Sequence, residues 1–178
     1  PLPDGTYGVS AGKAKYLSEI VIPAIYHGKA VTVILDDGFK NSVNLTKITI
    51  PEGITSIGDR AFSNCNNLIS VVIPKSVISI GAAAFSGCSK LTDVVIPDGV
   101  TSISDYAFSG CSSLISVTIP DGVTSIGSHT FENCSSLISV MIPKSVISIG
   151  DSVFFGCSKL TDIVIPDGVT SIGDRAFA

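Results

Sequence analysis

Hydrophobic and polar residues alternate over short stretches of this chain, and the same alternation returns many times. In KLTDVVIP, residues 90–97, Val94 and Ile96 alternate with Asp93 and Val95. A two-residue period is typical of a strand with one buried face. The proline that follows ends the strand, because it has no N–H to donate to a neighbouring strand. The pattern predicts a short strand, a bend at Asp-Gly or Lys-Ser, and a second short extended segment at VTSI.

These short strands belong to a repeat of 23 residues. Its fixed positions are the leucines Leu45, Leu68, Leu91, Leu114, Leu137 and Leu160, the cysteines Cys65, Cys88, Cys111, Cys134 and Cys157, and the phenylalanines Phe62, Phe85, Phe108, Phe131, Phe154 and Phe177. A fixed period in this range is typical of a solenoid, in which stacked units bury a core that no single unit can bury. The near-identical segments 88–103 and 157–172 lie 69 residues apart, which indicates that a block of three repeats was duplicated.

The sequence therefore predicts a mostly β repeat solenoid. Each 23-residue unit is expected to hold two short strands and a short helical or 3-10 turn that directs its phenylalanine inward. We expect residues 1–44 to form an N-terminal segment with a divergent repeat, and residues 45–178 to form six repeats, the last incomplete, in one continuous solenoid. Within the first segment, residues 16–23 match the first strand of the repeat. Residues 31–41 match its second extended segment and the turn that follows, and a longer loop lies between the two matches. Residues 1–15 are expected to form part of a cap, because terminal repeats are usually atypical.

Composition and chain ends narrow the function classes. Charged residues make up 15 % of the chain, the net charge is −4 and tryptophan is absent, so no nucleic acid partner is expected. Polar residues interrupt every stretch of 18 residues, so no membrane insertion is expected in this fragment. The chain has no initiator methionine and stops in mid-pattern, which favours a segment cut from a longer protein. An uncapped last repeat is expected to permit end-to-end self-association, because an unpaired sheet edge can pair with another chain.

The repeat, written as L-x-x-[VI]-x-I-P-x-x-[VI]-x-S-I-x-x-x-A-F-x-x-C, resembles the BspA-like leucine-rich repeat proteins over about residues 16–178. These are surface proteins of bacteria, with relatives in some parasitic protists. The resemblance implies a leucine-rich repeat-like fold, a cell-surface or secreted location and a role as an adhesin. It implies protein ligands such as fibronectin, fibrinogen, other bacteria or host receptors. The family is not known to be catalytic, so neither catalytic residues nor cofactors are expected.

The five cysteines are predicted to be buried and reduced. In a stack, equivalent side chains point the same way at about the strand spacing of ~4.8 Å, whereas a disulfide needs converging Cβ atoms about 3.8 Å apart. Their number is odd, and no C-x-x-C or accompanying set of histidines indicates zinc. We expect these thiols to behave as small hydrophobic side chains.

The recurring serines and aspartates are interpreted as structural. The serines are Ser56, Ser79, Ser102, Ser125, Ser148 and Ser171. A serine nucleophile needs a base beside it, and His129 lies next to no repeated acid. The aspartates are Asp36, Asp37, Asp59, Asp105, Asp151 and Asp174. They match neither a calcium β-roll nor an EF-hand, so turn formation explains them and no metal site is predicted.

One row of residues is a candidate partner-binding surface. Between the buried strand positions stand residues expected to point outward from the sheet: Thr49, Val72, Val95, Thr118, Met141 and Val164. Flanking them are Lys47, Asp93, Asp162 and the serines Ser70, Ser116 and Ser139. An exposed β-branched and methionine stripe with a polar and acidic rim has the composition of a recognition surface. Two alternatives stay open: valine and threonine suit strands without any ligand, or another part of the full protein covers them.

The sequence therefore predicts a non-enzymatic protein-binding module that uses the outward face of the stacked sheet. The alternative is a structural spacer or stalk that displays another domain, which the duplicated three-repeat blocks favour. An enzyme on a β-solenoid is disfavoured, because Asp93 and Asp162 lie three strands apart, roughly 14 Å. The carboxyl groups of a catalytic pair lie within about 9.5 Å of each other.

Overall fold

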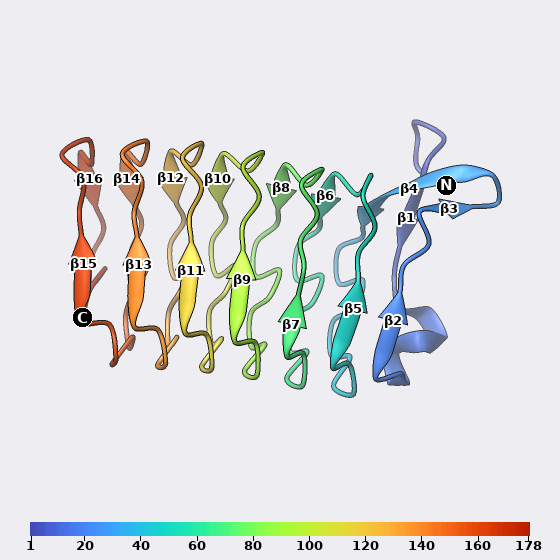
Figure 1. The fold of residues 1–178 in the computed structure, drawn as a ribbon, viewed down its shortest axis with the longest axis horizontal. Coiled ribbons are helices and arrows are strands. Elements are labelled where there is room, and N and C mark those ends of the chain that lie inside the picture. The colour runs from blue at the N-terminus through green and yellow to red at the C-terminus, as the bar shows by residue number, and fades with distance from the viewer.

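The chain winds into a solenoid whose successive turns lie side by side along one axis (Figure 1). The computed structural model describes all 178 residues. Each full winding of the solenoid, called a rung below, contributes short strands to two opposite walls. One wall is a seven-stranded parallel sheet in the order β15-β13-β11-β9-β7-β5-β2, called the leading sheet below. Its strands are Glu19–Val21 (β2), Lys47–Thr49 (β5), Ser70–Val71 (β7), Asp93–Val95 (β9), Ser116–Thr118 (β11), Ser139–Met141 (β13) and Asp162–Val164 (β15).

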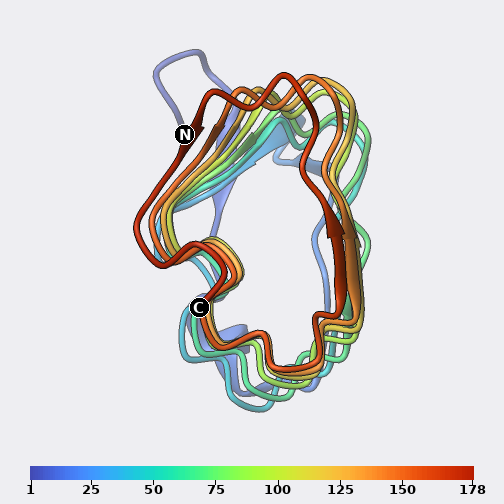
Figure 2. The same ribbon diagram turned by 90° about the vertical axis from the view of Figure 1, so that its left-hand side faces the viewer.

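The opposite wall consists of two separate ladders. Strands β1, β4, β6 and β8 form one, with β3 paired to β4, and strands β10, β12, β14 and β16 form the other. Their bounds are Tyr7–Val9 (β1), Ile25–Tyr26 (β3), Lys29–Ile34 (β4), Ser56–Ile57 (β6), Ser79–Ile80 (β8), Ser102–Ile103 (β10), Ser125–Ile126 (β12), Ser148–Ile149 (β14) and Ser171–Ile172 (β16). Viewed along the axis, the two walls face each other across an oval cross-section (Figure 2).

Equivalent residues of successive repeats pair directly with each other, as the 23-residue period predicts. Ser116 pairs with Ser139, and Val117 pairs with Val140, in parallel strands. Each rung is too small to bury its own hydrophobic residues, so the neighbouring rungs complete its core. The predicted mostly β solenoid is confirmed.

The N-terminal segment joins this stack with an irregular rung. β2 pairs with β5 and β4 pairs with β6, so strands within residues 16–23 and 31–41 lie beside the equivalent strands of the next rung. The longer loop between them is a hairpin of β3 and β4, in which His27 and Gly28 have φ values of 48° and 75°. β1 pairs with β4 at the edge of the wall, and the only helix is the 3-10 turn Gly12–Tyr16 (η1).

The third side of each rung is a run of hydrogen-bonded turns, where the sequence led us to expect a helical or 3-10 turn. Its backbone N–H groups alternate in direction: Arg60, Phe62 and Asn64 donate to carbonyls of the next rung. Ala61 and Ser63 donate instead to residues three positions earlier in their own rung. Arg60 and Asn64 have φ values of 53° and 59°, which interrupt the right-handed backbone that a helix needs. Stacking thus takes up the donors that a helix would have used internally.

The recurring aspartates also bond between rungs. In four cases the Oδ1 atom of an aspartate accepts a hydrogen bond from the backbone N–H of the equivalent residue one rung later. The pairs are Asp36 with Asp59, Asp59 with Ala82, Asp105 with Ser128, and Asp151 with Asp174, each at 2.8 Å. The aspartates therefore do more than form their own turns, because each one ties its rung to the next.

The core is a single cluster of 44 buried residues in which equivalent side chains form columns. The most regular column consists of stacked phenylalanine rings, with centroids 5.1–5.7 Å apart and interplanar angles of 16° or less. Its members are Phe39, Phe62, Phe85, Phe108, Phe131, Phe154 and Phe177. The column runs through the whole stack, so each internal ring contacts the rung before it and the rung after it.

The cysteines form a second buried column, and all five are free thiols, as the sequence predicted. Each Sγ atom donates a hydrogen bond to the backbone carbonyl of a phenylalanine in the preceding rung, at 3.1–3.3 Å. Burial raises the pKa of Cys65 and of Cys157 to about 11. Burial also raises the pKa values of Cys88, Cys111 and Cys134, which lie deeper in the stack. The native thiols therefore stay protonated at neutral pH.

We expect a thiol reagent to label the folded protein slowly at neutral pH, because thiolate is the reactive form and none of the five is accessible. Cys157, in the last complete rung, is expected to react first. Stability should also fall as the pH rises from 9 to about 11, because the unfolded thiols ionise there while the folded thiols hold their protons. Time-resolved labelling with and without denaturant measures the first effect, and rapid labelling of all five thiols without denaturant would contradict it.

Candidate protein-binding face

The outward surface of the leading sheet carries every residue singled out from the sequence as a candidate for partner binding. Strand alternation places Val71, Val94 and Val117 in the core, and the neighbouring residues in each strand point towards solvent. The outward residues are Thr49, Val72, Val95, Thr118, Met141 and Val164, with Lys47, Asp93 and Asp162 beside them, and all of them are exposed. Val72, Met141 and Val164 have 78–79 % of their surface exposed. The face is therefore an apolar stripe in open solvent.

The structure extends this face beyond the residues expected from the sequence. In β2, Glu19 pairs with Lys47 and Val21 pairs with Thr49, so the stripe begins one rung earlier. A charged column also runs beside the stripe, one residue after each Ile-Pro pair from Ile50–Pro51 to Ile165–Pro166. Its members are Glu52, Lys75, Asp98, Asp121, Lys144 and Asp167. The sequence shows that these charged residues recur every 23 positions. It does not show that the turn after each Ile-Pro pair lies beside the outward face of the leading sheet.

None of the charged side chains on this face is held in an ion pair. The ion pairs of the molecule join Lys40 to Asp37 and Arg60 to Asp37, and His129 contacts Glu132, all in the turns of the third side. There the Arg60 guanidinium holds the pKa of the Asp37 carboxyl well below its usual range. The charges of the leading face therefore have no ion pair within the chain to give up on binding.

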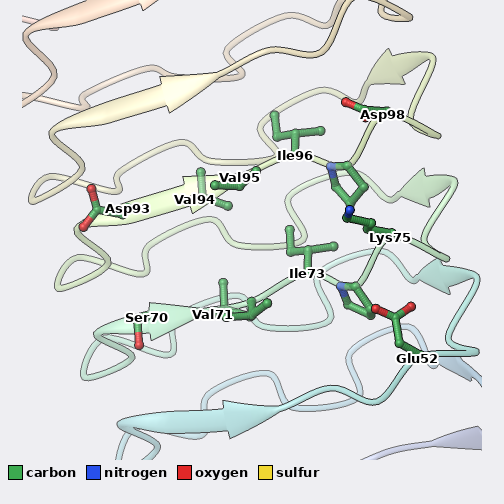
Figure 3. Close-up of a pocket in the computed structure, with 13 residues that line it drawn as sticks. Glu52, Ser70, Val71, Ile73, Lys75, Asp93, Val94, Val95, Ile96 and Asp98 are labelled. Carbon is green, nitrogen blue, oxygen red and sulfur yellow. The ribbon is translucent and has the colours of Figure 1, made fainter.

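A recess in this face lies between β7 and β9. It has a volume of about 560 Å³ and is lined by the two strands and by the Ile-Pro turns that follow them. Figure 3 shows Ser70 and Asp93 at one end of the recess and Glu52, Lys75 and Asp98 at the other. The strands on either side are joined by a single residue pair, Ser70 with Asp93, whereas β9 and β11 share three pairs. The recess therefore coincides with a weakly paired part of the sheet.

The remaining polar groups form no arrangement typical of a catalytic or metal site. The repeated serines lie in the opposite wall, and none of them has a hydrogen bond to a histidine. His129 stacks on Tyr106 with ring centroids 4.5 Å apart, and its Nδ1 atom lies 3.2 Å from Glu132 Oε2. No group of three His, Cys, Asp or Glu side chains is placed to hold a metal ion. No helix in the structure is long and apolar enough to cross a membrane.

Comparison with known families and structures assigns the repeat. The model of the BspA type leucine-rich repeat region matches six copies, over residues 13–98, 32–137 and 83–178. No curated protein matches the chain significantly.

Three solved structures share the fold. A leucine-rich cell surface protein of Faecalibacterium prausnitzii has 44 % sequence identity and a TM-score of 0.82, covering 90 % of this chain and 45 % of that one. The leucine-rich repeat protein of T. pallidum has 32 % identity and a TM-score of 0.84, covering 88 % and 73 %. A leucine-rich repeat protein of Eubacterium ventriosum has 32 % identity and a TM-score of 0.80, covering 90 % and 42 %. The chain spans less than half the length of the first and third of these proteins.

Proposed function

The chain belongs to the BspA-type leucine-rich repeat family, and from this premise we propose that it is a non-enzymatic protein-binding module. Its place of action is the cell surface or the secreted state, as for the cell surface protein of Faecalibacterium prausnitzii that it resembles. Its ligands are extracellular matrix proteins or host receptors, so the module serves adhesion.

The observation that carries this proposal is the exposed stripe on the leading sheet. Val72, Val95, Met141 and Val164 each expose 69–79 % of their surface. Large exposed apolar patches with a polar rim mark interaction sites in soluble proteins. The stripe lacks Tyr, Trp and Arg, the residues that dominate compact binding hot spots. Binding along several rungs at once therefore suits it better than one tight contact.

We expect a Val72→Glu, Val95→Glu, Met141→Glu variant to lose at least tenfold in affinity for its protein ligand, because the three carboxylates would have to be desolvated in the interface. The measurement is binding to surface-immobilised fibronectin, fibrinogen and purified host receptors. A matched control adds the same three charges to the opposite wall, at the exposed residues Ile78, Thr101 and Ile147.

The control variant should bind within twofold of the unchanged protein, and circular dichroism should show both variants folded. Equal losses in the two variants would contradict the assignment of the leading face. Saturable binding by neither variant nor the unchanged protein would favour the alternative, a spacer or stalk, which the duplicated three-repeat blocks support.

End-to-end self-association stays a prediction. The last rung leaves part of the core column uncovered, in a depression of about 360 Å³ whose lining includes Leu160, Ile163 and Phe177. A second copy stacked on this rung would bury these side chains and pair with the edge strand β15.

A further inference from the structure

Within the six repeats the least regular joint lies between the rung of β7 and β8 and the rung of β9 and β10. In the opposite wall β8 and β10 do not pair, and this break separates the two ladders (Figure 1). In the leading sheet the strands β7 and β9 share only one residue pair. On the third side the same two rungs stay joined, because Ala83 donates to Asp105 O at 2.9 Å and Phe85 donates to Ala107 O at 2.8 Å. The joint therefore has reduced strand pairing in both walls and keeps its backbone bonds at the turns.

Ser104 stands at this joint, at a position that is glycine in the other five repeats and Leu35 in the N-terminal segment. The glycines are Gly58, Gly81, Gly127, Gly150 and Gly173. A Cβ atom on any of them would lie 2.5–2.8 Å from backbone atoms of the preceding rung, where there is no room for it. Each glycine N–H donates to an isoleucine carbonyl of that rung at 2.8–2.9 Å. The N–H of Ser104 makes no such bond, and its Oγ donates to Ile80 O at 2.7 Å instead.

A second substitution removes a further bond at the same joint. Ala82 occupies the position where neighbouring rungs have aspartate or serine, so no side chain accepts the N–H of Asp105. The N–H of Thr101 also lacks the bond to the preceding rung that Thr124 makes to Thr101 O at 2.9 Å. Two sequence departures and the loss of three hydrogen bonds from backbone N–H groups thus fall on one joint, and the recess lies on the leading-sheet side of the same joint.

The recess has a definite chemical character. It reaches down between the strands to Val71 and Val94, which are buried in the core, so its floor is apolar. Its rim carries the carboxylates of Glu52, Asp93 and Asp98 and the single ammonium group of Lys75, and none of these is in an ion pair within the chain. The carboxylates stand at both ends of the recess (Figure 3). Asp93 and Asp98 are five positions apart in the chain, and an extended peptide rises about 3.3 Å per residue, so about five extended residues are enough to reach from one to the other.

We propose that Ser104 and Ala82 hold this joint open, and that the recess binds an aliphatic side chain of an extended segment with basic residues at both ends. The acidic rim complements the basic residues, and the apolar floor complements the aliphatic side chain. This inference rests on the proposed protein-binding function and narrows it to one place on the leading face and one class of partner segment.

The joint itself is tested without any ligand, by amide hydrogen exchange on a Ser104→Gly, Ala82→Ser variant. Serine at position 82 copies Ser128, whose Oγ accepts the N–H of Asp151 at 3.2 Å. We expect the amides of Thr101, of residue 104 and of Asp105 to gain at least tenfold in protection. A Gly127→Ser variant should lose a similar factor at the next joint. Unchanged protection in both variants would overturn the role of Ser104 and Ala82.

The occupant is tested with the capped peptide Lys-Thr-Val-Ile-Thr-Lys and its counterpart with glutamate in place of both lysines. We expect the lysine peptide to shift the methyl NMR signals of Val72 and Val95 saturably and to leave those of Val164 unchanged. The glutamate peptide should shift neither, and the Ser104→Gly, Ala82→Ser variant should bind the lysine peptide at least fivefold more weakly. No saturable shift, or equal affinity in the variant, would overturn the docking of a basic segment. Neither outcome decides the binding of whole protein ligands, which the triple glutamate variant tests separately.

Discussion

Replacing Phe108 with alanine is expected to lower the free energy of unfolding by about 4 kcal/mol. The ring is completely buried and stacks on Phe85 and Phe131, with centroids 5.4 Å and 5.7 Å away. Alanine would leave a cavity that the rungs cannot close, because the backbone bonds between them fix their spacing. Both neighbouring rungs would lose contacts, so the effect spreads in each direction along the stack.

Phe177 provides a matched control for this loss. It ends the phenylalanine column with one stacked neighbour, Phe154, and 40 % of its surface is exposed. Its replacement by alanine should therefore cost about 1 to 2 kcal/mol. Equilibrium unfolding in urea, followed by circular dichroism, measures both variants. Equal losses at Phe108 and Phe177 would mean that the column does not hold the rungs together.

Replacing Gly150 with alanine is expected to cost about 2 kcal/mol, although it adds only one methyl group. The new Cβ atom would lie 2.6 Å from the backbone nitrogen of Ser128 and 2.8 Å from the carbonyl carbon of Gly127. Backbone atoms cannot rotate away as a side chain can, so the two rungs would have to separate. The variant would therefore acquire a joint like the one at Ser104.

Gly122 is the control for this substitution, because it has an ordinary backbone conformation and more space. Its nearest neighbour, Asp98 O, lies 3.3 Å from the position of an added Cβ atom. Alanine there should change the free energy of unfolding by less than about 1 kcal/mol. Urea unfolding of the two alanine variants gives the comparison, and a loss at Gly122 as large as that at Gly150 would contradict the close approach inferred for the glycine column.

Much of the fold follows from residues that are visible in the sequence. The 23-residue spacing of Leu, Cys and Phe predicts which residues stack, and the alternation around Val94 predicts which side of the strand is buried. The outward positions of Val72 and Met141 follow from the same alternation. These predictions depend only on the period, which is why they hold from rung to rung.

The rest depends on how closely the rungs approach each other. The helical turn expected before each cysteine does not form, because N–H groups such as that of Phe62 bond to the next rung. The serine at position 104 is visible in the sequence as a departure from glycine. Its effect is not, because only the structure shows that the Cβ atom would meet the backbone of the preceding rung. The recess between β7 and β9 was unpredictable for the same reason.

The leading face combines regular and irregular features, and each suggests a part in binding. The regular stripe offers the same kind of contact on every rung, which suits an extended ligand. The recess beside Val72 and Val95 occurs at one joint only, so it can fix the position at which such a ligand binds. A stack built from near-identical repeats would otherwise offer a ligand several equivalent registers.

The most direct test of the central claim is amide hydrogen exchange on this protein alone and in the presence of each matrix or receptor protein proposed as its ligand. We expect slower exchange in the strands of the leading sheet and in the Ile-Pro turns beside them, from β5 to β15. Exchange in β6, β8, β10, β12, β14 and β16 of the opposite wall should be unchanged. Protection confined to the opposite wall, or to the last rung, would contradict the assignment of the leading face as the binding surface.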